Sequence, residues 1–144
     1  IIPEEVELKG TLRTFDADTR ARLRTRILEV AEGTAKVMRC TLQSEWFEGT
    51  PAVVNDAYSV ARFREVAARV VGEDGVTLQA PIMGGDDMAL WLAQARGCYF
   101  FVGTNSGPDT AWAHHHSRFD IDERGLEIAV NLLASGVSDL MSGD

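Results

Sequence analysis

The sequence lacks several features that whole classes of protein require. No apolar run approaches the ~20 residues that a helix needs to cross a bilayer. No basic stretch followed by an apolar one marks a secretory signal near the start. Basic residues are outnumbered by acidic ones: the chain has 14 Lys and Arg and 22 Asp and Glu, which gives a net charge of −8. This balance argues against nucleic-acid binding, which normally needs a basic face.

Cysteine is also scarce. The chain has two cysteines, Cys40 and Cys98, whose spacing matches neither a CxxC motif nor a metal site. Two free thiols are typical of a reducing compartment. We therefore expect a cytoplasmic protein that binds neither nucleic acid nor membrane.

What is present fits one ordinary globular domain by length. The chain has 144 residues, of which 45% are hydrophobic and 25% charged, as in most soluble proteins. It begins without Met, at "IIPEEVELKG", and passes directly into an alternating apolar pattern. We expect that a segment upstream of Ile1 belongs to the intact protein.

The hydrophobic pattern alternates between strand-like and helix-like segments. Alternating or continuous apolar residues predict strands at residues 6–15, 40–49, 76–81 and 98–103. Helical spacing predicts four helices, which begin near residues 16–18, 55–56, 86–87 and 122. This order predicts an α/β fold that divides near residues 51–56. The third helix is expected to end at Gly97. The arginines of the first helix are interpreted as a solvated face: Arg20, Arg22, Arg24 and Arg26.

All 3 histidines lie together in "AWAHHHSRFDIDE", residues 111–123. Histidine is a common metal ligand, but a metal usually needs about three or four protein ligands from different segments. In an extended backbone successive side chains point to opposite faces, so pattern alone favours His114 and His116 as a pair. The alternative is a polar loop cluster without a ligand. Asp122, just behind, is interpreted as a helix cap rather than a ligand.

Two further segments are candidates for binding. "GGDDM", residues 84–88, places Asp86 and Asp87 after a glycine turn, where their carboxylates could orient a ligand. The alternative for them is a helix cap with a favourable dipole contact. The loop "GTNSGP", residues 103–108, follows a predicted strand, at the end where open α/β sheets place their ligands.

Several of these segments together resemble a known family. "IIPEEVELKGTLRTFD", "PAVVND", "PIMGGDD", "YFFVGT" and "HHSRFDIDERGLEIAVNLL" stand in the order seen in metal-dependent amidohydrolases of metallopeptidase family 20. The subgroup holds hippurate hydrolases, N-acyl-amino-acid amidohydrolases and indole-acetyl amino acid hydrolases. The resemblance runs from Ile1 to about Ala134. It implies an α/β lid domain, which usually dimerises, inserted in an α/β catalytic domain.

The resemblance also implies a division of the chain. Residues 1–53 would be the second half of the lid or dimerisation domain, and residues 54–144 the C-terminal part of the catalytic domain. The other metal ligands of the family and its acidic general base lie upstream of Ile1. No catalytic residue is therefore expected in this chain, and the chain alone is expected to be inactive.

One metal ligand is assigned by the resemblance. The family places its last ligand at a His four positions before a Phe, and here that Phe is Phe119. The ligand is then His115, which replaces the pairing of His114 with His116. Ser117 stands where many members have Pro, and the third histidine is an addition, so the register among the histidines stays open by one residue.

Two more residues are assigned in the same way. Arg13 of "GTLRTF" matches a lid arginine that in related carboxypeptidases holds the substrate carboxylate, which suits a planar guanidinium. Its alternative is a surface arginine paired with a neighbour such as Glu7. Asp86 of "GGDDM" stands where members often have the Glu of "GSEDF". It is a candidate for supporting the metal site, with a shorter side chain than the family residue.

The function implied is hydrolysis of an amide bond in an N-acyl amino acid or similar small substrate, by a homodimer. Each complete active site would hold two divalent ions, zinc, manganese or cobalt, which polarise the carbonyl and activate a water. A rival hypothesis is a non-catalytic fragment or pseudoenzyme that acts as a binding or dimerisation module. A third is a small-molecule sensor domain that uses the Arg13 pocket without the histidines.

Overall fold

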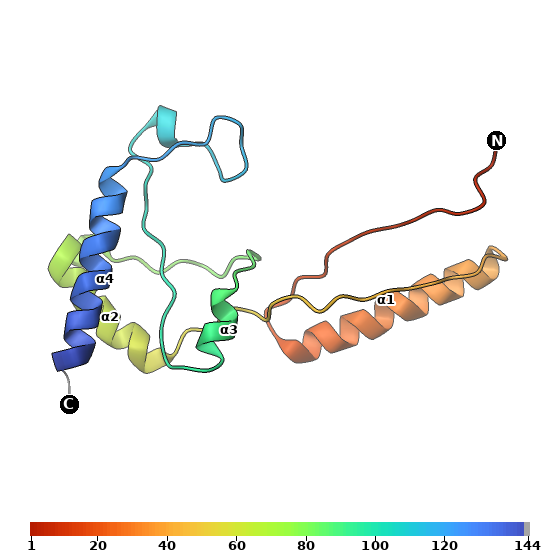
Figure 1. Ribbon diagram of the computed structural model, residues 1–144, viewed down its shortest axis with the longest axis horizontal. Helices are drawn as coiled ribbons and strands as arrows, with labels where there is room; N and C mark the ends of the chain where they lie inside the picture. Colours follow the sequence, from red (N-terminus) through yellow and green to blue (C-terminus); the bar gives the residue numbers. More distant parts are fainter. Residues whose placement is uncertain (143–144) are drawn as a thin grey trace. The chain divides into compact units, whose positions relative to one another are not determined.

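The computed structural model describes residues 1–142 and falls into two compact units. Unit 1 comprises Ile1–Val53 and Pro81–Trp91, and unit 2 comprises Val54–Ala80 and the chain from Leu92 onward. Figure 1 shows the elements in chain order: α1 (Ala17–Val37), α2 (Ala57–Val71), the 3-10 turn η1 (Glu73–Gly75), α3 (Met88–Leu92), the 3-10 turn η2 (Pro108–Thr110) and α4 (Arg124–Ser142). The assignment of residues 1–53 to a lid and 54–144 to a catalytic domain stays a prediction.

The prediction of an α/β fold is wrong for the described residues. Residues 1–142 contain α-helices and 3-10 turns but no β-strand. The four segments predicted as strands run without regular secondary structure: 6–15, 40–49, 76–81 and 98–103. An alternating pattern reports which side chains favour burial, whereas a strand also needs a second backbone for its hydrogen bonds. In this part of the chain the four segments are not paired with one another.

The predicted starts of the helices are confirmed at their caps. The carboxylates of Asp16 and Asp56 accept the N–H of the third residue after each cap, at 2.7 and 2.9 Å. These hydrogen bonds lower the pKa of both carboxyl groups below the ordinary value. The third helix, expected to reach Gly97, is only 5 residues long. Its one buried residue is Ala89, and packing therefore gives a longer helix little support.

The arginine face of α1 is only partly solvated, which corrects its interpretation as a solvated face. Figure 1 shows the segment after α1 running back alongside the helix. Arg20 donates a hydrogen bond to the Thr50 carbonyl at 2.7 Å. Arg24 forms an ion pair with Glu48 at 2.7 Å and lies 5.2 Å from the centre of the Trp46 ring. These contacts attach the segment to the helix within unit 1.

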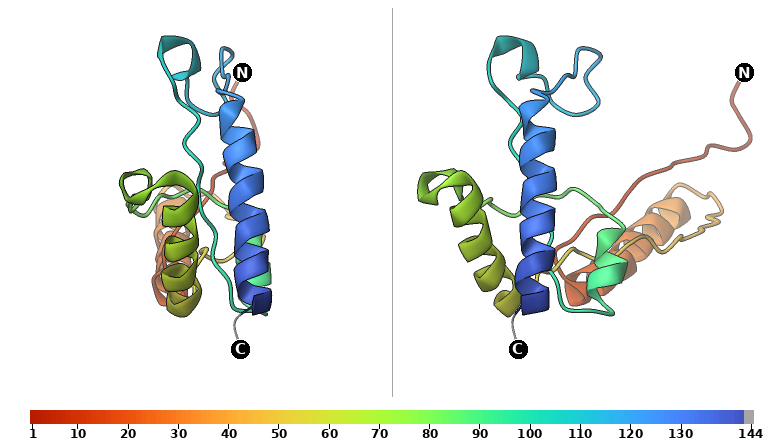
Figure 2. Two further views of the ribbon diagram at one scale, coloured as in Figure 1. Left: turned by 90° about the vertical axis from the view of Figure 1, so that its left-hand side faces the viewer. Right: turned by 60° about the vertical axis from the view of Figure 1, so that its left-hand side comes forward.

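The core of unit 2 lies between α2 and α4, which pack side by side in both views of Figure 2. Val66 of α2 and Leu132 of α4 are 1% and 5% exposed. At Gly136 a Cβ would lie 3.0 Å from the Phe63 ring, so glycine permits this close approach of the helices. The Phe63 and Phe100 rings lie 4.4 Å apart between centroids. The apolar segment around Phe100 is thereby attached to the helix pair.

One carboxylate also joins the two helices. Asp139 of α4 forms ion pairs with Arg62 at 2.7 Å and with Arg69 at 3.0 Å, both on α2. The hydrogen bond from Arg62, followed by that from Arg69, lowers the pKa of Asp139 below its ordinary value. The charged form of Asp139 therefore stabilises the packed helix pair.

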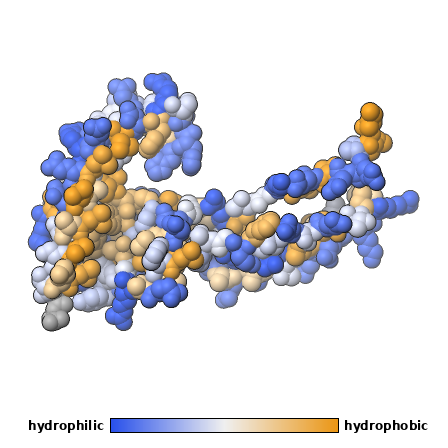
Figure 3. All heavy atoms as spheres, in the orientation of Figure 1, coloured by the Kyte–Doolittle hydropathy of each residue, from blue (hydrophilic) through white to orange (hydrophobic). Residues whose placement is uncertain are grey.

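The large apolar residues that recur at helical spacing along α4 form a stripe that does not face α2. Figure 3 shows hydrophobic side chains gathered along α4. The members of the stripe are 55% to 68% exposed: Leu126, Val130, Leu133, Val137 and Leu140. Leu132 and Gly136, on another face, are the residues that are buried against α2. Close approach at glycine thus decides which face packs. Among residues 1–142, no helix combines the length and apolar character needed to cross a membrane.

Candidate functional site

The three histidines lie in an exposed loop between η2 and α4, within unit 2. The Ala113 carbonyl accepts the His116 N–H at 3.1 Å, and the His116 carbonyl accepts the Phe119 N–H at 3.0 Å. Two tight turns therefore follow one another. Because the backbone is not extended here, the alternation that pairs His114 with His116 does not apply.

Two of the three histidine rings are held by other rings of the loop. The His116 ring stacks on Trp112, with centroids 4.2 Å apart and an angle of 15° between planes. Its Nδ1 also accepts the Arg118 N–H at 3.1 Å. The His114 ring meets the Phe119 ring edge-on at 5.0 Å. The Arg118 guanidinium lies 4.5 Å from the centre of the Trp112 ring.

Trp112 and Arg118 are not predicted as site residues from the sequence. The only signal that could reveal them is an aromatic residue and a cation on either side of a histidine run. Such a pattern is common in loops and says nothing about stacking until the turn geometry is known.

His115 differs from both of its neighbours. Within residues 1–142 its ring makes no hydrogen bond, ion pair or ring contact, and the residue is exposed. Its φ of 67° lies in the left-handed region, which His adopts more readily than most residues with a Cβ. It occupies the third position of the first turn, where type II turns need a positive φ. The ring nitrogens of His115 are therefore not engaged by any residue of the described part of the chain.

The interpretation of Asp122 as a helix cap is confirmed. Its carboxylate accepts the Arg124 N–H at 3.0 Å and pairs with the Arg124 guanidinium. Hydrogen bonds from the side chains of Arg124 and then Ser106 hold the pKa of Asp122 well below its usual range. The Asp122 N–H donates to the Thr104 carbonyl at 2.9 Å. The loop at residues 103–108 thus anchors the start of α4.

Arg13 lies in unit 1 against the glycine turn that precedes Asp86. A Cβ placed on Gly85 would lie 2.8 Å from a guanidinium nitrogen of Arg13. Arg13 is exposed and forms no ion pair in the part of the chain that the structure describes. Glu7, the neighbour proposed as its alternative partner, pairs with Lys9 at 3.1 Å instead. The Arg13 guanidinium is therefore available to an anion.

Asp86 is half-buried in the same turn. Its carboxylate accepts the Met88 N–H at 2.8 Å at the start of α3, as the cap alternative expects. A role in supporting the metal site stays a prediction. The structure brings Asp86 and Arg13 into unit 1, whereas His115 belongs to unit 2.

The described residues provide one fitting donor rather than a complete metal centre. Across residues 1–142, no group of three or more His, Cys, Asp or Glu side chains is placed to hold a metal ion. The His115 imidazole fits the requirement for a single ligand, because it is exposed and its nitrogens are not used elsewhere in these residues.

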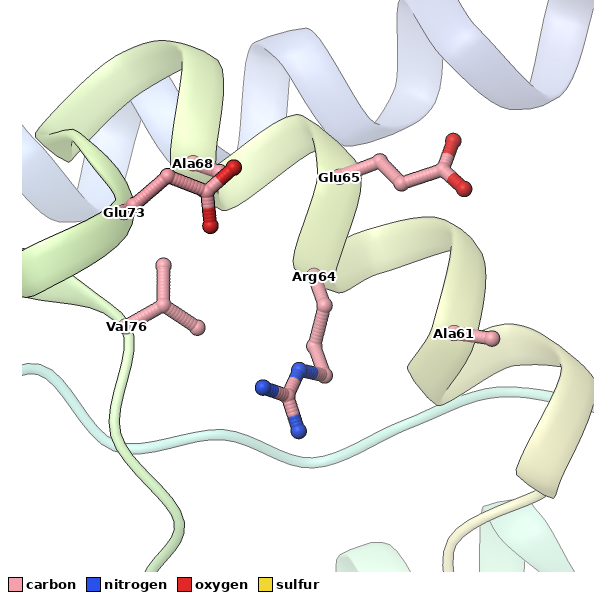
Figure 4. A pocket seen from close by; sticks show the side chains of 6 residues that line it. All are labelled: Ala61, Arg64, Glu65, Ala68, Glu73 and Val76. Atoms are coloured by element: carbon pink, nitrogen blue, oxygen red, sulfur yellow. The ribbon is translucent and has the colours of Figure 1, made fainter.

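A shallow hollow of about 360 Å³ lies beside α2 and η1 in unit 2. Its lining is shown in Figure 4: Ala61, Arg64, Glu65, Ala68, Glu73 and Val76. The side chains of Arg64 and Glu65 leave α2 in different directions. None of the residues predicted for the site lines this hollow, so it is not the candidate site.

The chain matches one family model over nearly its whole length. The model of peptidase family M20/M25/M40 covers residues 4–139. The chain belongs to that family. The resemblance to metal-dependent hydrolases is therefore confirmed at the level of the family. No solved structure gives a significant match.

Several of the curated relatives bear the names of hydrolases. An N-acetylcysteine deacetylase of Bacillus subtilis is 33% identical over 134 residues, which make up 93% of this chain and 34% of the relative. Thermostable carboxypeptidase 1 of Saccharolobus solfataricus is 25% identical over 130 residues, 89% of this chain and 32% of the relative. The chain thus spans about a third of the length of the curated relatives it matches.

Proposed function

We propose that the intact protein hydrolyses an amide bond in an N-acyl amino acid or a related small substrate, with divalent metal ions as cofactors. Family membership supports the reaction class. The relative named N-acetylcysteine deacetylase supports the substrate class, because N-acetylcysteine carries both an amide bond and a free carboxylate. The observation that carries the proposal is the histidine loop, in which His115 alone lacks a partner among the described residues.

His115 is the proposed ligand of one metal ion. Its two neighbours are held by ring contacts with Trp112 and Phe119, which leaves His115 as the ring free to turn outward. A metal needs about three or four protein ligands, so further ligands come from other parts of the intact protein. When bound, a divalent ion acts as a Lewis acid toward the carbonyl that is attacked.

Arg13 is the proposed partner of the substrate carboxylate. Its guanidinium is exposed and forms no ion pair within residues 1–142, and a planar guanidinium can bind a carboxylate through two hydrogen bonds. Asp86 caps α3 and so steadies the turn that Arg13 touches at Gly85. We propose Asp86 as a support of the metal ligands on the strength of the resemblance.

The test of the function uses the intact enzyme. It is purified, stripped of metal with a chelator, and reloaded with zinc, manganese or cobalt, and turnover of N-acyl amino acids is measured at each stage. We expect turnover to be lost on chelation and restored on reloading. Absence of turnover with all three metals would favour a non-catalytic binding or dimerisation module.

The homodimer and the cytoplasmic location stay predictions. Light scattering of the intact enzyme tests whether it is a dimer.

A further inference from the structure

We propose that Trp112 and Arg118 are positioning residues that hold His115 in the orientation of a metal ligand. The proposal rests on the proposed function, because it takes His115 to be a ligand. It adds a mechanism for orienting that ligand, built from the ring contacts of the loop at residues 111–119.

The backbone at His115 needs such support. Its φ of 67° is disfavoured for a residue with a Cβ and persists where the surrounding structure enforces it. Glycine or asparagine is the usual residue at this position of a type II turn. A histidine at this position indicates a role for its ring, and it indicates that other contacts maintain the turn.

The contacts that maintain the turn lie on both sides of His115. The His114 and Phe119 rings meet edge to face at 5.0 Å, and the His116 ring is stacked on Trp112 at 4.2 Å. The Arg118 guanidinium lies 4.5 Å from the centre of the Trp112 ring, in the range of a cation–π interaction. Trp112 is therefore in contact with one neighbour of His115 and with the cation that follows the histidines.

Within residues 1–142, the position of the His115 ring is set by the backbone of this turn. A ligand histidine usually donates its second N–H to a hydrogen-bond partner, which fixes the ring. Within residues 1–142 the His115 ring has no such partner. The contacts of Trp112 with His116 and Arg118 substitute for that hydrogen bond, because they fix the turn that carries His115.

The experiment measures metal affinity of the intact enzyme, by competition with a chromophoric chelator for zinc. Trp112→Ala should weaken the affinity by about 10- to 100-fold, the usual effect of losing a residue that supports a ligand. Trp112→Phe keeps an aromatic face and should stay close to the wild type. Trp91→Ala is the matched control, because Trp91 is 69% exposed and lies on α3, and its affinity should not change.

A double-mutant cycle tests whether Trp112 acts through His115. In the His115→Ala background, Trp112→Ala should cause no further loss of metal affinity. The thermal midpoint of the metal-free Trp112→Ala protein should stay near that of the metal-free wild type. Arg118→Ala, which keeps every ring, should weaken affinity in the same direction by a smaller factor.

Three results would overturn the inference. The first is unchanged affinity in both Trp112→Ala and Arg118→Ala while His115→Ala loses metal, which leaves the proposed function intact. The second is an equal Trp112→Ala effect with and without His115, which would make Trp112 merely structural. The third is a His115→Ala enzyme that binds metal like wild type, which removes the ligand itself and so the proposed role of His115.

Discussion

Replacing Arg13 by alanine in the intact enzyme should lower kcat/KM for an N-acyl amino acid by about 10- to 100-fold. Arg13 has no carboxylate partner in residues 1–142, and its guanidinium lies against Gly85. A hydrogen bond to a charged group is worth about 1.5–3 kcal/mol, and about 1.4 kcal/mol corresponds to a tenfold change in rate. A surface ion pair is worth only about 0–1 kcal/mol, so its loss would hardly change the kinetics.

The assay compares two substrates that differ in one group, the carboxylate of the amino acid and a neutral amide in its place. The penalty of Arg13→Ala should shrink on the amide, because the arginine then has no anion to bind, and metal content should not change. Lys9→Ala is the control, since Lys9 carries the same charge four positions earlier in the chain but already pairs with Glu7. Equal losses on both substrates would show that Arg13 is structural and refute the reasoning.

Three further predictions concern stability and the isolated chain. Leu132→Ala should lower the free energy of unfolding by about 2–5 kcal/mol in a urea titration, and Leu133→Ala, 57% exposed, by far less; similar losses would contradict the packing of α4. Asp139→Asn should lower the thermal midpoint near neutral pH. Because Arg62 and Arg69 lower the pKa of Asp139, the Asp139 carboxylate contributes to stability above the ordinary carboxyl pKa, and this contribution is lost as pH falls through the lowered value. A difference in thermal midpoint between Asp139→Asn and wild type that persists in acid would contradict this prediction. The 144-residue chain alone should show no metal-dependent turnover, and clear turnover with zinc, manganese or cobalt would disprove this.

Helix starts were predictable because caps are local. Asp16 and Asp56 each lie within three residues of the N–H that they accept, so the chain order alone places donor and acceptor together. Strands depend on a second backbone that can come from anywhere in the sequence. The alternation at residues 6–15 therefore predicts a strand that the described residues do not form.

Packing faces and ring contacts were beyond prediction for a related reason. The apolar stripe of α4 suggests one packed face, but Gly136, which has no Cβ, admits Phe63 on another. Alternation along the histidines suggests the pair His114 and His116, but the loop turns twice and occupies both of those rings. The family resemblance assigns His115 instead, since it counts positions from Phe119 and needs no backbone geometry; this assignment stays a prediction.

The most direct test of the account is a comparison of His114→Ala, His115→Ala and His116→Ala in the intact enzyme, by metal content and turnover together. The account predicts that His115→Ala loses metal and nearly all turnover. The neighbouring histidines cannot take over as the ligand, because their rings are already held in contacts with Trp112 and Phe119. The other two variants should lose far less, and His116→Ala should recover at higher metal concentration. An inactive His116→Ala with an active His115→Ala would contradict the assignment and move the ligand by one residue.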